Sequence, residues 1–246
     1  MTAIVGILCS DGVVVGCDSS ATFTGTQILT IEQRVKKLDI IGDRVIVAGT
    51  GQIGLGQRFC GIVKQAHEEK VFQVDHLKVG VALSKAAIAN FAETQTQVGQ
   101  YGALVAYTCS GRFFLCEFAT RDFQPEFKSS TMWFVSVGSG QTITDPFLGF
   151  IRRVFWKDSL PSVAEGIFFA TWTLQHVIDL NVGGINAPIQ MAVIRTDGKG
   201  NAKAEEITDA ELQEHQNNVG ELEKYLSDYK RILKTGDAAT IPQIKK

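Results

Sequence analysis

The first stretch of the chain, MTAIVGILCSDGVVVGCD (Met1–Asp18), decides the fold. Two short apolar runs flank a turn signal at Ser10-Asp11-Gly12, a pattern typical of a β-hairpin. Such a hairpin would carry Asp18 back beside Thr2, the second residue of the chain. The stretch therefore predicts that a carboxylate and a threonine lie next to each other at one end of a sheet.

Thr2 gains a distinctive chemistry if Met1 is removed, because it then carries a hydroxyl and a free α-amine on one residue. A threonine hydroxyl is a weak nucleophile until a base takes its proton. An α-amine, with a reference pKa of about 8, is more often neutral near pH 7 than a lysine amine and suits that task. A threonine paired with its own amine is a known nucleophile–base arrangement. Taken alone, Thr2 would be an ordinary second residue.

Composition narrows the class of protein. A chain of 246 residues with a net charge of −2 fits one large domain or two small ones and gives no reason to expect nucleic acid or an anionic membrane as partner. No apolar run reaches the roughly 18 residues of a membrane span, and the N-terminus lacks the basic region of a secretory signal. The five cysteines show no CxxC spacing, which indicates buried thiols in a cytoplasmic protein. The histidines show no ligand spacing, so we expect no metal and no cofactor.

Strands and helices are expected in separate blocks. Periodicity predicts helices at about 53–69, 75–93, 145–156 and 162–179. The expected buried side of the second helix consists of Leu77, Val81, Leu83, Ala86, Ala87 and Phe91. Strands are expected before, between and after these helix pairs, and the polar segment 120–130 is expected to be a loop. This order favours an α+β fold in which helices cover sheets on both sides.

The tail differs in character from the rest of the chain. Thr208-Asp209-Ala210-Glu211 fits a capping box at the start of a helix. We therefore expect one domain at residues 1–205 and a helical extension at 206–246, packed on its own domain or on a neighbouring subunit. The apolar residues that predict the helix recur every seven positions, at Leu212, Val219, Leu226 and Leu233.

The order of these motifs resembles the proteasome β-subunit family and its bacterial relatives, which are N-terminal-nucleophile hydrolases. The resemblance covers about residues 2–200, which is most of the chain. It implies a four-layer αββα sandwich with, in this chain, an added C-terminal helix. The motifs that carry it are the opening hairpin with the spacing from Thr2 to Asp18, Lys37 on an alternating segment, Gly49 after an apolar strand, the Gly138-Ser139-Gly140 loop, and Asp179 four residues before Gly183-Gly184.

The resemblance implies a threonine-type endopeptidase that cleaves peptides or unfolded proteins. Thr2 would be the nucleophile and its α-amine the general base. Family members form homo-oligomeric rings, often two stacked rings with the active sites inside a chamber. Many work with an ATP-dependent unfoldase, and none of this requires a cofactor.

Each matched residue has an implied role. The Lys37 cation would lower the energy of the Thr2 alkoxide, and Asp18 would hold and neutralise that cation. Ser139 and Asp179 would hydrogen-bond the α-amine, and the Gly49 amide would donate to the developing oxyanion. The segment between Asp18 and Lys37 is a few residues longer than in many relatives. Lys36 is therefore a second, weaker candidate for the lysine role.

The same resemblance implies a substrate site. Four small uncharged residues would line the pocket for the residue before the cleaved bond, which favours bulky apolar side chains. Extended backbone at Thr22 and at Gly49 to Gly51 would pair with the substrate as an added strand. The four pocket residues are Ala21, Val35, Val47 and Gly51.

Two other interpretations remain open. Gly49-Thr50-Gly51-Gln52-Ile53-Gly54 is a literal GxGxxG between a strand and a helix, the signature of a dinucleotide site, although no βαβ repeat follows it. The second alternative is a catalytically silent subunit that only builds a ring or scaffold. Val182 favours it, because the family often has a serine at that position. Individually, Asp18 could be a turn residue and Lys37 a solvated charge.

Overall fold

A computed structural model describes residues 1–24, 29–156, 159–180, 183–197 and 199–235. The predicted turn at Thr24–Thr26 therefore lies only partly within the described residues, and Val182 lies outside them. The strands are β1 Ile4–Leu8, β2 Gly12–Cys17, β3 Ser20–Thr24, β4 Leu29–Arg34, β5 Leu38–Ile41, β6 Val45–Gly51, β7 Tyr101–Cys109, β8 Arg112–Phe118, β9 Pro125–Phe127, β10 Phe134–Val137, β11 Gln190–Thr196 and β12 Ala202–Glu206. The helices are α1 Ile53–Glu68, the short 3-10 helix η1 Val71–Gln73, α2 His76–Ala92, α3 Gln141–Phe155, α4 Val163–Asp179 and α5 Asp209–Thr235.

The opening hairpin forms the centre of the first antiparallel sheet, whose strand order is β10-β1-β2-β11-β12. β1 pairs with β2 from Ile4 opposite Cys17 onward, so the residues flanking the hairpin lie together at its open end. Gly12 is required by packing, because a Cβ there would lie 2.2 Å from the carbonyl oxygen of Ile194 on the next strand. The predicted hairpin is thus confirmed, and it is fixed on both edges by neighbouring strands.

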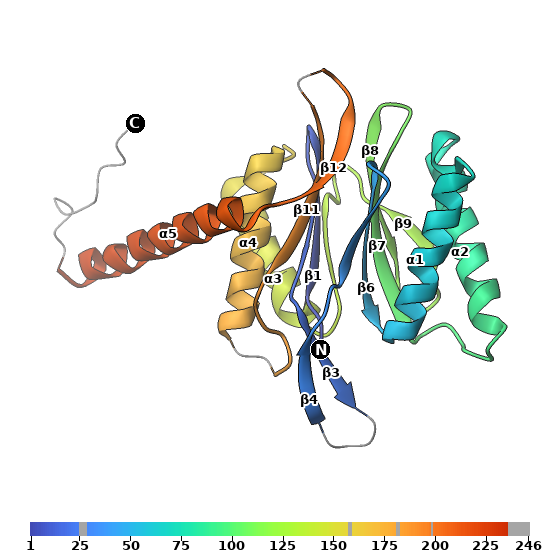
Figure 1. Cartoon of the computed structure of the whole chain (residues 1–246). Helices are drawn as coiled ribbons and strands as arrows, with labels where there is room; N and C mark the ends of the chain where they lie inside the picture. Colours follow the sequence, from blue (N-terminus) through green and yellow to red (C-terminus); the bar gives the residue numbers. More distant parts are fainter. Residues whose placement is uncertain (25–28, 157–158, 181–182, 198, 236–246) are drawn as a thin grey trace.

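The second sheet has the order β5-β6-β7-β8-β9 and is also antiparallel. Its end strand β9 lies within the segment expected to be a loop, where Glu117 of β8 pairs with Glu126. Lys128, just beyond β9, forms ion pairs with both glutamates and so compensates the like charges opposite each other. A separate two-stranded ribbon of β3 and β4 projects from one end of the molecule (Figure 1).

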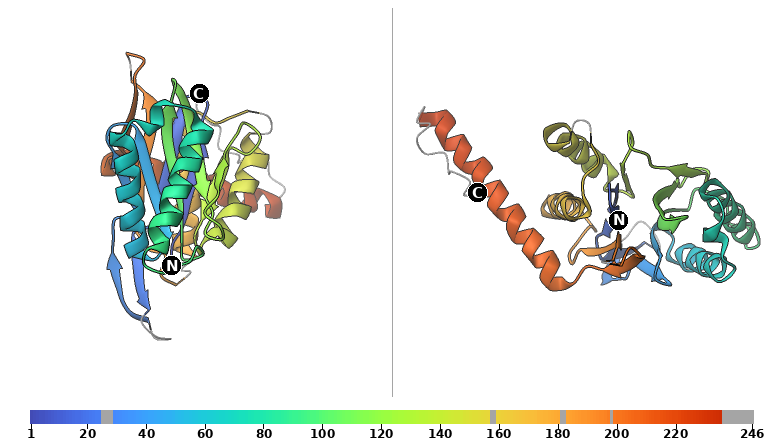
Figure 2. Two further views of the ribbon diagram at one scale, coloured as in Figure 1. Left: turned by 90° about the vertical axis from the view of Figure 1, so that its right-hand side faces the viewer. Right: turned by 90° about the horizontal axis from the view of Figure 1, so that it is seen from above.

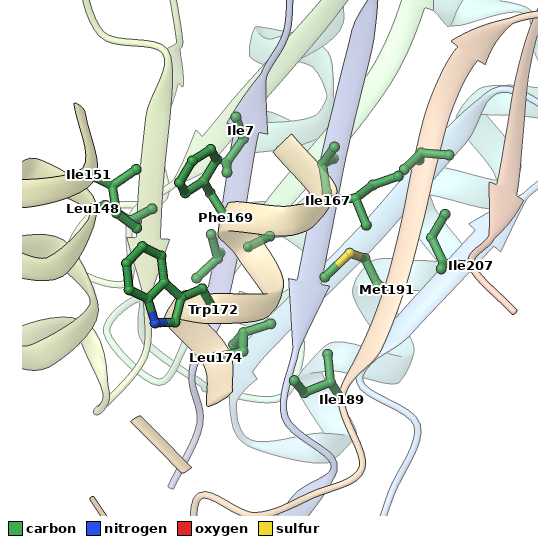
Figure 3. Close-up of a cluster of buried hydrophobic side chains, with 14 of the residues drawn as sticks. Ile7, Leu148, Ile151, Ile167, Phe169, Trp172, Leu174, Ile189, Met191 and Ile207 are labelled. Carbon is green, nitrogen blue, oxygen red and sulfur yellow. The ribbon is translucent and has the colours of Figure 1, made fainter. Parts of the chain in front are cut away.

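Four layers result, with α3 and α4 outside the first sheet and α1 and α2 outside the second (Figures 1 and 2). Three apolar clusters fill the spaces between successive layers. In the cluster under α3 and α4, Phe169 lies beside Ile7 of β1, and Trp172 lies beside Leu148 of α3 (Figure 3). The α+β sandwich of the N-terminal-nucleophile hydrolase type is confirmed. In the described part of the chain, no helix combines the length and the apolar character needed to cross a membrane.

Helix α5 leaves the sandwich and extends well beyond it (Figures 1 and 2). Its first half packs on α4, where Val219 is buried and the indole nitrogen of Trp172 donates to Glu223 at 2.8 Å. Farther along, Leu226 and Tyr229 of the apolar stripe are 55% and 54% exposed. The first half of α5 therefore packs on its own domain, as one of the two alternatives expected. The exposed stripe of the second half leaves the other alternative, contact with a neighbouring subunit, open.

The buried face of α2 was predicted correctly only in part, at Leu83, Ala87 and Phe91. In α2, Leu77 and Val81 are 55% and 43% exposed, whereas Val79, Leu83 and Ala87 face the core. The N-cap itself is as expected, since the Asp75 carboxylate accepts from the backbone N–H groups at the start of the helix. The sequence allowed two neighbouring apolar stripes, and contact with the second sheet buries only one of them.

Candidate active site

The open end of the β1–β2 hairpin brings Thr2 and Asp18 together. The backbone of Ala3 connects them, because its N–H donates to Asp18 Oδ1 at 2.9 Å and its carbonyl accepts from the Asp18 N–H at 3.1 Å. The other carboxylate oxygen accepts from the Ser20 N–H at 3.0 Å. Asp18 is fully buried, so backbone donors and one cation provide all the stabilisation its charge receives.

That cation is Lys37, which precedes β5. Its ammonium nitrogen lies 2.8 and 2.9 Å from the two Asp18 oxygens and 3.2 Å from the Thr2 hydroxyl oxygen. The side chain is only 7% exposed, so the pair is shielded from water. Lys36 points elsewhere: it is 57% exposed and binds Glu206 at 2.8 Å. The geometry therefore favours Lys37 over Lys36 as the site lysine.

The Gly138-Ser139-Gly140 loop encloses the other side of Thr2. The Thr2 N–H donates to Ser139 Oγ at 3.0 Å, and the Gly140 N–H donates to the Thr2 carbonyl at 3.0 Å. Gly138 has φ +101°, and a Cβ there would lie 2.3 Å from the Thr2 carbonyl oxygen. Only glycine allows the loop to approach Thr2 this closely.

Gly49 lies on β6 beside the cavity that Thr2 also lines. Its N–H donates to the Lys37 carbonyl at 3.4 Å, a long contact that a better acceptor could readily replace. A Cβ at this position would lie 2.0 Å from the hydroxyl oxygen of Tyr101. The position thus requires glycine, and its amide is available to an oxyanion.

Asp179, predicted to hydrogen-bond the α-amine, has no described hydrogen bond to Thr2 or Ser139. It ends α4, and its carboxylate accepts from Gln175 at 2.6 Å, one turn earlier on the same helix. Gln175 in turn accepts from Gln216 of α5 at 3.2 Å. In this arrangement Asp179 belongs to a polar link between α4 and α5.

A cavity of about 570 Å³ opens next to Thr2 and Lys37. Four of the five residues predicted to bind substrate line it, namely Ala21, Val35, Val47 and Gly51. The fifth, Thr22, lies on β3 with its backbone paired to Glu32.

The cavity also has polar walls that sequence reasoning missed. Asp39, Cys60 and Lys64 line it, and the Asp39 carboxylate accepts from the Cys60 thiol at 3.5 Å. Burial, with the Asp39 charge adding to it, raises the pKa of Cys60 to about 12. Asp39 could have been predicted from the sequence, because it follows Val35 and Lys37 at alternate positions. Cys60 and Lys64 come from α1, and no local pattern indicates how a helix lies over a strand.

Two other site types were tested by the structure. The GxGxxG segment does join a strand to a helix, but β6 pairs antiparallel to β5 and β7 rather than entering a parallel βαβ unit. The dinucleotide interpretation therefore lacks its fold. Across the described ranges, no three His, Cys, Asp or Glu side chains are grouped so that they could hold a metal ion.

The buried Lys37–Asp18 pair beside Thr2, at the end of a two-sheet sandwich, is the arrangement expected of an N-terminal-nucleophile fold. The family model described as "Proteasome subunit" matches residues 2–149. The chain belongs to the proteasome subunit family. A search of curated proteins found no match.

Solved structures with the same fold include three Anbu proteins. A Gly-1 mutant of Anbu from Hyphomicrobium sp. strain MC1 aligns with a TM-score of 0.72 at 13% identity, over 95% of this chain and 100% of that one. The helical assembly of the Anbu complex from Pseudomonas aeruginosa gives 0.71 at 15% identity, over 97% and 99%. Anbu, an ancestral beta-subunit, from Yersinia bercovieri gives 0.64 at 14% identity, over 100% and 99%. At these identities the likeness establishes the fold.

Proposed function

We propose that this chain is a threonine-type endopeptidase that cleaves peptides or unfolded proteins with Thr2 as nucleophile, after removal of Met1. The observation that carries the proposal is the Lys37 ammonium, held at 2.8 Å by the Asp18 carboxylate and placed 3.2 Å from the Thr2 hydroxyl oxygen. A buried cation at that position stabilises negative charge on the oxygen far more than a solvated one would.

The reaction would begin with transfer of the hydroxyl proton to the α-amine of Thr2. The oxygen then attacks the substrate carbonyl, and the oxyanion accepts a hydrogen bond from the Gly49 amide. The protonated amine gives its proton to the departing nitrogen, which leaves an ester on Thr2. Water, deprotonated by the same amine, hydrolyses the ester and regenerates the hydroxyl.

The substrate would bind as an added strand beside the end of β6. β7 pairs with one edge of Gly49 to Gly51, while the pairing of β5 with β6 ends at Leu38 opposite Ala48. An extended peptide could occupy the edge of β6 that β5 leaves beyond this point. The residue before the cleaved bond would then enter the cavity lined by Val35 and Val47, and the backbone of Thr22 would pair with the substrate.

Assembly into a homo-oligomer is part of the proposal. The Anbu complex from Pseudomonas aeruginosa, one of the structural neighbours, forms a helical assembly, and the family resemblance implies rings. We assign residues 1–205 to the hydrolase domain and 206–246 to an extension whose far apolar stripe contacts a second copy. Five free cysteines agree with a cytoplasmic protein. Light scattering of the purified protein checks this point, and a monomer at micromolar concentration would contradict it.

The second candidate function is a catalytically silent subunit. It is favoured by the Asp179 carboxylate, which binds Gln175 instead of approaching Thr2. A silent subunit would keep Met1 or leave the Thr2 hydroxyl unreactive.

Intact mass before and after treatment with a β-lactone distinguishes the two functions. The endopeptidase proposal expects loss of Met1 and one acyl adduct, which peptide mapping places on Thr2. Thr2→Ser should retain the adduct and Thr2→Ala should lose it. Retained Met1 and no adduct on the assembled protein would favour the silent subunit.

A further inference from the structure

A second cavity, of about 640 Å³, lies on the other side of the junction between β6 and α1. It shares Gly51, Gln52 and Ile53 with the cavity beside Thr2, so the two cavities are neighbours. Thr2 lines the first cavity and Ser139 lines the second. A peptide lying across Thr2 would therefore have one cavity on each side of the bond to be cleaved.

The chemistry of the proposed reaction decides which part of the peptide enters which cavity. The Thr2 nitrogen points toward Ser139, to which its N–H donates at 3.0 Å. That nitrogen delivers the proton to the departing amine, so the departing amine lies on the Ser139 side. Gly49, whose amide serves the oxyanion, lines only the first cavity. We infer that the second cavity binds the leaving segment, the residues just after the cleaved bond, and that it favours uncharged hydrogen-bonding side chains there. This inference rests on the proposed function.

The preference follows from the residues that line the second cavity. Among the described residues, none that lines this cavity is charged; the polar lining groups are amides and hydroxyls, and the other lining residues are glycines and Ile53. Gln52 donates to Gln100 at 3.1 Å, which orients both amides and leaves the Gln100 NH₂ group as a donor for a ligand. The polar lining residues are Thr50, Gln52, Gln100, Thr120, Ser139 and Gln141.

Such a lining discriminates by desolvation. A glutamine or serine side chain exchanges its hydrogen bonds with water for bonds to the amides and hydroxyls of the cavity. A carboxylate or ammonium loses part of its hydration and meets no opposite charge. Because the lining side chains are largely exposed, we expect a modest preference of about three- to tenfold, the size of one ordinary hydrogen bond.

Competition between water and an added amine for the acyl-enzyme tests this inference directly. The full-length assembled protein is acylated with a peptidyl-aminomethylcoumarin, and an amino acid amide is added. Its α-amine attacks the Thr2 ester, a new amide bond forms, and the Thr2 hydroxyl is released with its proton; nothing is oxidised or reduced. The ratio of aminolysis to hydrolysis product, measured by mass spectrometry, reports binding of the added amide. Glutaminamide and serinamide should give a ratio three- to tenfold above glutamic acid α-amide and lysinamide.

Two variants locate the effect. Gln100→Glu should raise the ratio for lysinamide and lower it for glutamic acid α-amide, because it places a negative charge in the cavity. Gln97→Glu, an exposed glutamine of the same loop outside the cavity, should change neither ratio. Equal ratios for all four amides, unchanged by Gln100→Glu while hydrolysis proceeds, would overturn the inference and leave the proposed function intact. Absence of any acyl-enzyme would overturn both.

Discussion

At the scale of single residues, the Lys37 ammonium is shared among three acceptor groups. These are the Asp18 carboxylate, the Thr2 hydroxyl and the Met1 carbonyl, the last at 3.2 Å. Removal of Met1 takes away one of these acceptors and leaves the ammonium to the other two. The charge of Lys37 would then be divided between the carboxylate that holds it and the oxygen that reacts.

Replacement of Lys37 by methionine should affect both stability and reactivity. It leaves the fully buried Asp18 without its cation, and loss of one partner of a buried pair typically costs about 3–5 kcal/mol. Labelling of Thr2 by a β-lactone should slow by about 100-fold or more. Lys36→Met is the matched control, because the exposed Lys36–Glu206 pair contributes about 1 kcal/mol or less. Urea unfolding and labelling kinetics measure the two effects; equal behaviour of the two variants would contradict the role of Lys37.

Cys60 should be a poorly reactive thiol although it lines the cavity beside Thr2. Its pKa of about 12 leaves very little thiolate near pH 8, and the thiolate is the form that reacts. Alkylation by iodoacetamide, followed by mass spectrometry, should be slow at pH 8 and accelerate as the pH is raised. Asp39→Asn should accelerate it only partly, because burial is the larger cause of the raised pKa. Rapid alkylation of the folded protein at pH 8 would contradict the assignment.

The hairpin pattern predicted that Thr2 and Asp18 lie together, and the family resemblance added Lys37 and Ser139; the structure brings these four within hydrogen-bonding distance of one another in a chain of contacts. Each lies in or directly beside a hairpin or turn, so local pattern fixes its position. Asp179 was not predictable in the same way. Its hydrogen-bond partner Gln175 is oriented by Gln216 of α5, a residue distant in sequence whose position depends on how α5 packs.

At the scale of elements, the failures share one physical cause. β9 is a three-residue strand that exists because Pro125 to Phe127 lie along the edge of β8, not because the segment itself has an alternating pattern. The exposed face of α2 is likewise set by the sheet beneath it. Local sequence specifies that an element forms, whereas the neighbouring layer specifies which residues it buries.

Helix α5 should attach less firmly to α4 in acid. Burial lowers the pKa of His215, an effect that Glu211 and Glu214 partly oppose, and the side chain packs near Phe168 of α4. The folded state therefore binds a proton more weakly than the unfolded chain, whose histidine pKa is about 6.5. The free energy of unfolding is therefore retained above about pH 6.5 and falls as the pH drops below the pKa of the unfolded histidine.

His215→Gln should reduce this loss of stability. Thermal unfolding of both proteins at pH 7.5 and pH 5.5 gives the comparison: the drop in melting temperature on acidification should be smaller for the variant. A drop of the same size would show that His215 does not contribute to the acid sensitivity.

At the scale of the whole molecule, the far half of α5 has few contacts with its own domain. The helix crosses α4 as far as the Trp172–Glu223 hydrogen bond, and beyond that point Tyr225, Leu226 and Tyr229 are largely exposed. An apolar stripe on a projecting helix is typical of a contact between subunits. Such a contact from an arm on one copy to a different surface on the next can close into a ring or propagate as a helix.

Leu226→Glu should therefore weaken self-association. Leu77→Glu on α2 is the matched control, since both leucines are 55% exposed and the two helices lie on opposite sides of the sandwich. Sedimentation velocity at micromolar concentration should show a shift of the Leu226→Glu protein toward monomer and no shift for Leu77→Glu. If only the α2 variant dissociates, the subunit contact lies on that side of the molecule.

The position of Thr2 between the Gly138–Gly140 loop and Lys37 also governs how this protein can be handled. If the proposed function holds, an affinity tag, fluorophore or fusion partner attached ahead of Thr2 would turn the amine proposed as the base into a peptide amide and fill the mouth of the cavity beside it. The outer end of α5, at the other extremity of the molecule, is the attachment point that leaves the chemistry untouched (Figure 1). Recombinant material that carries an uncleaved leader would register as inert for a reason that lies in its preparation.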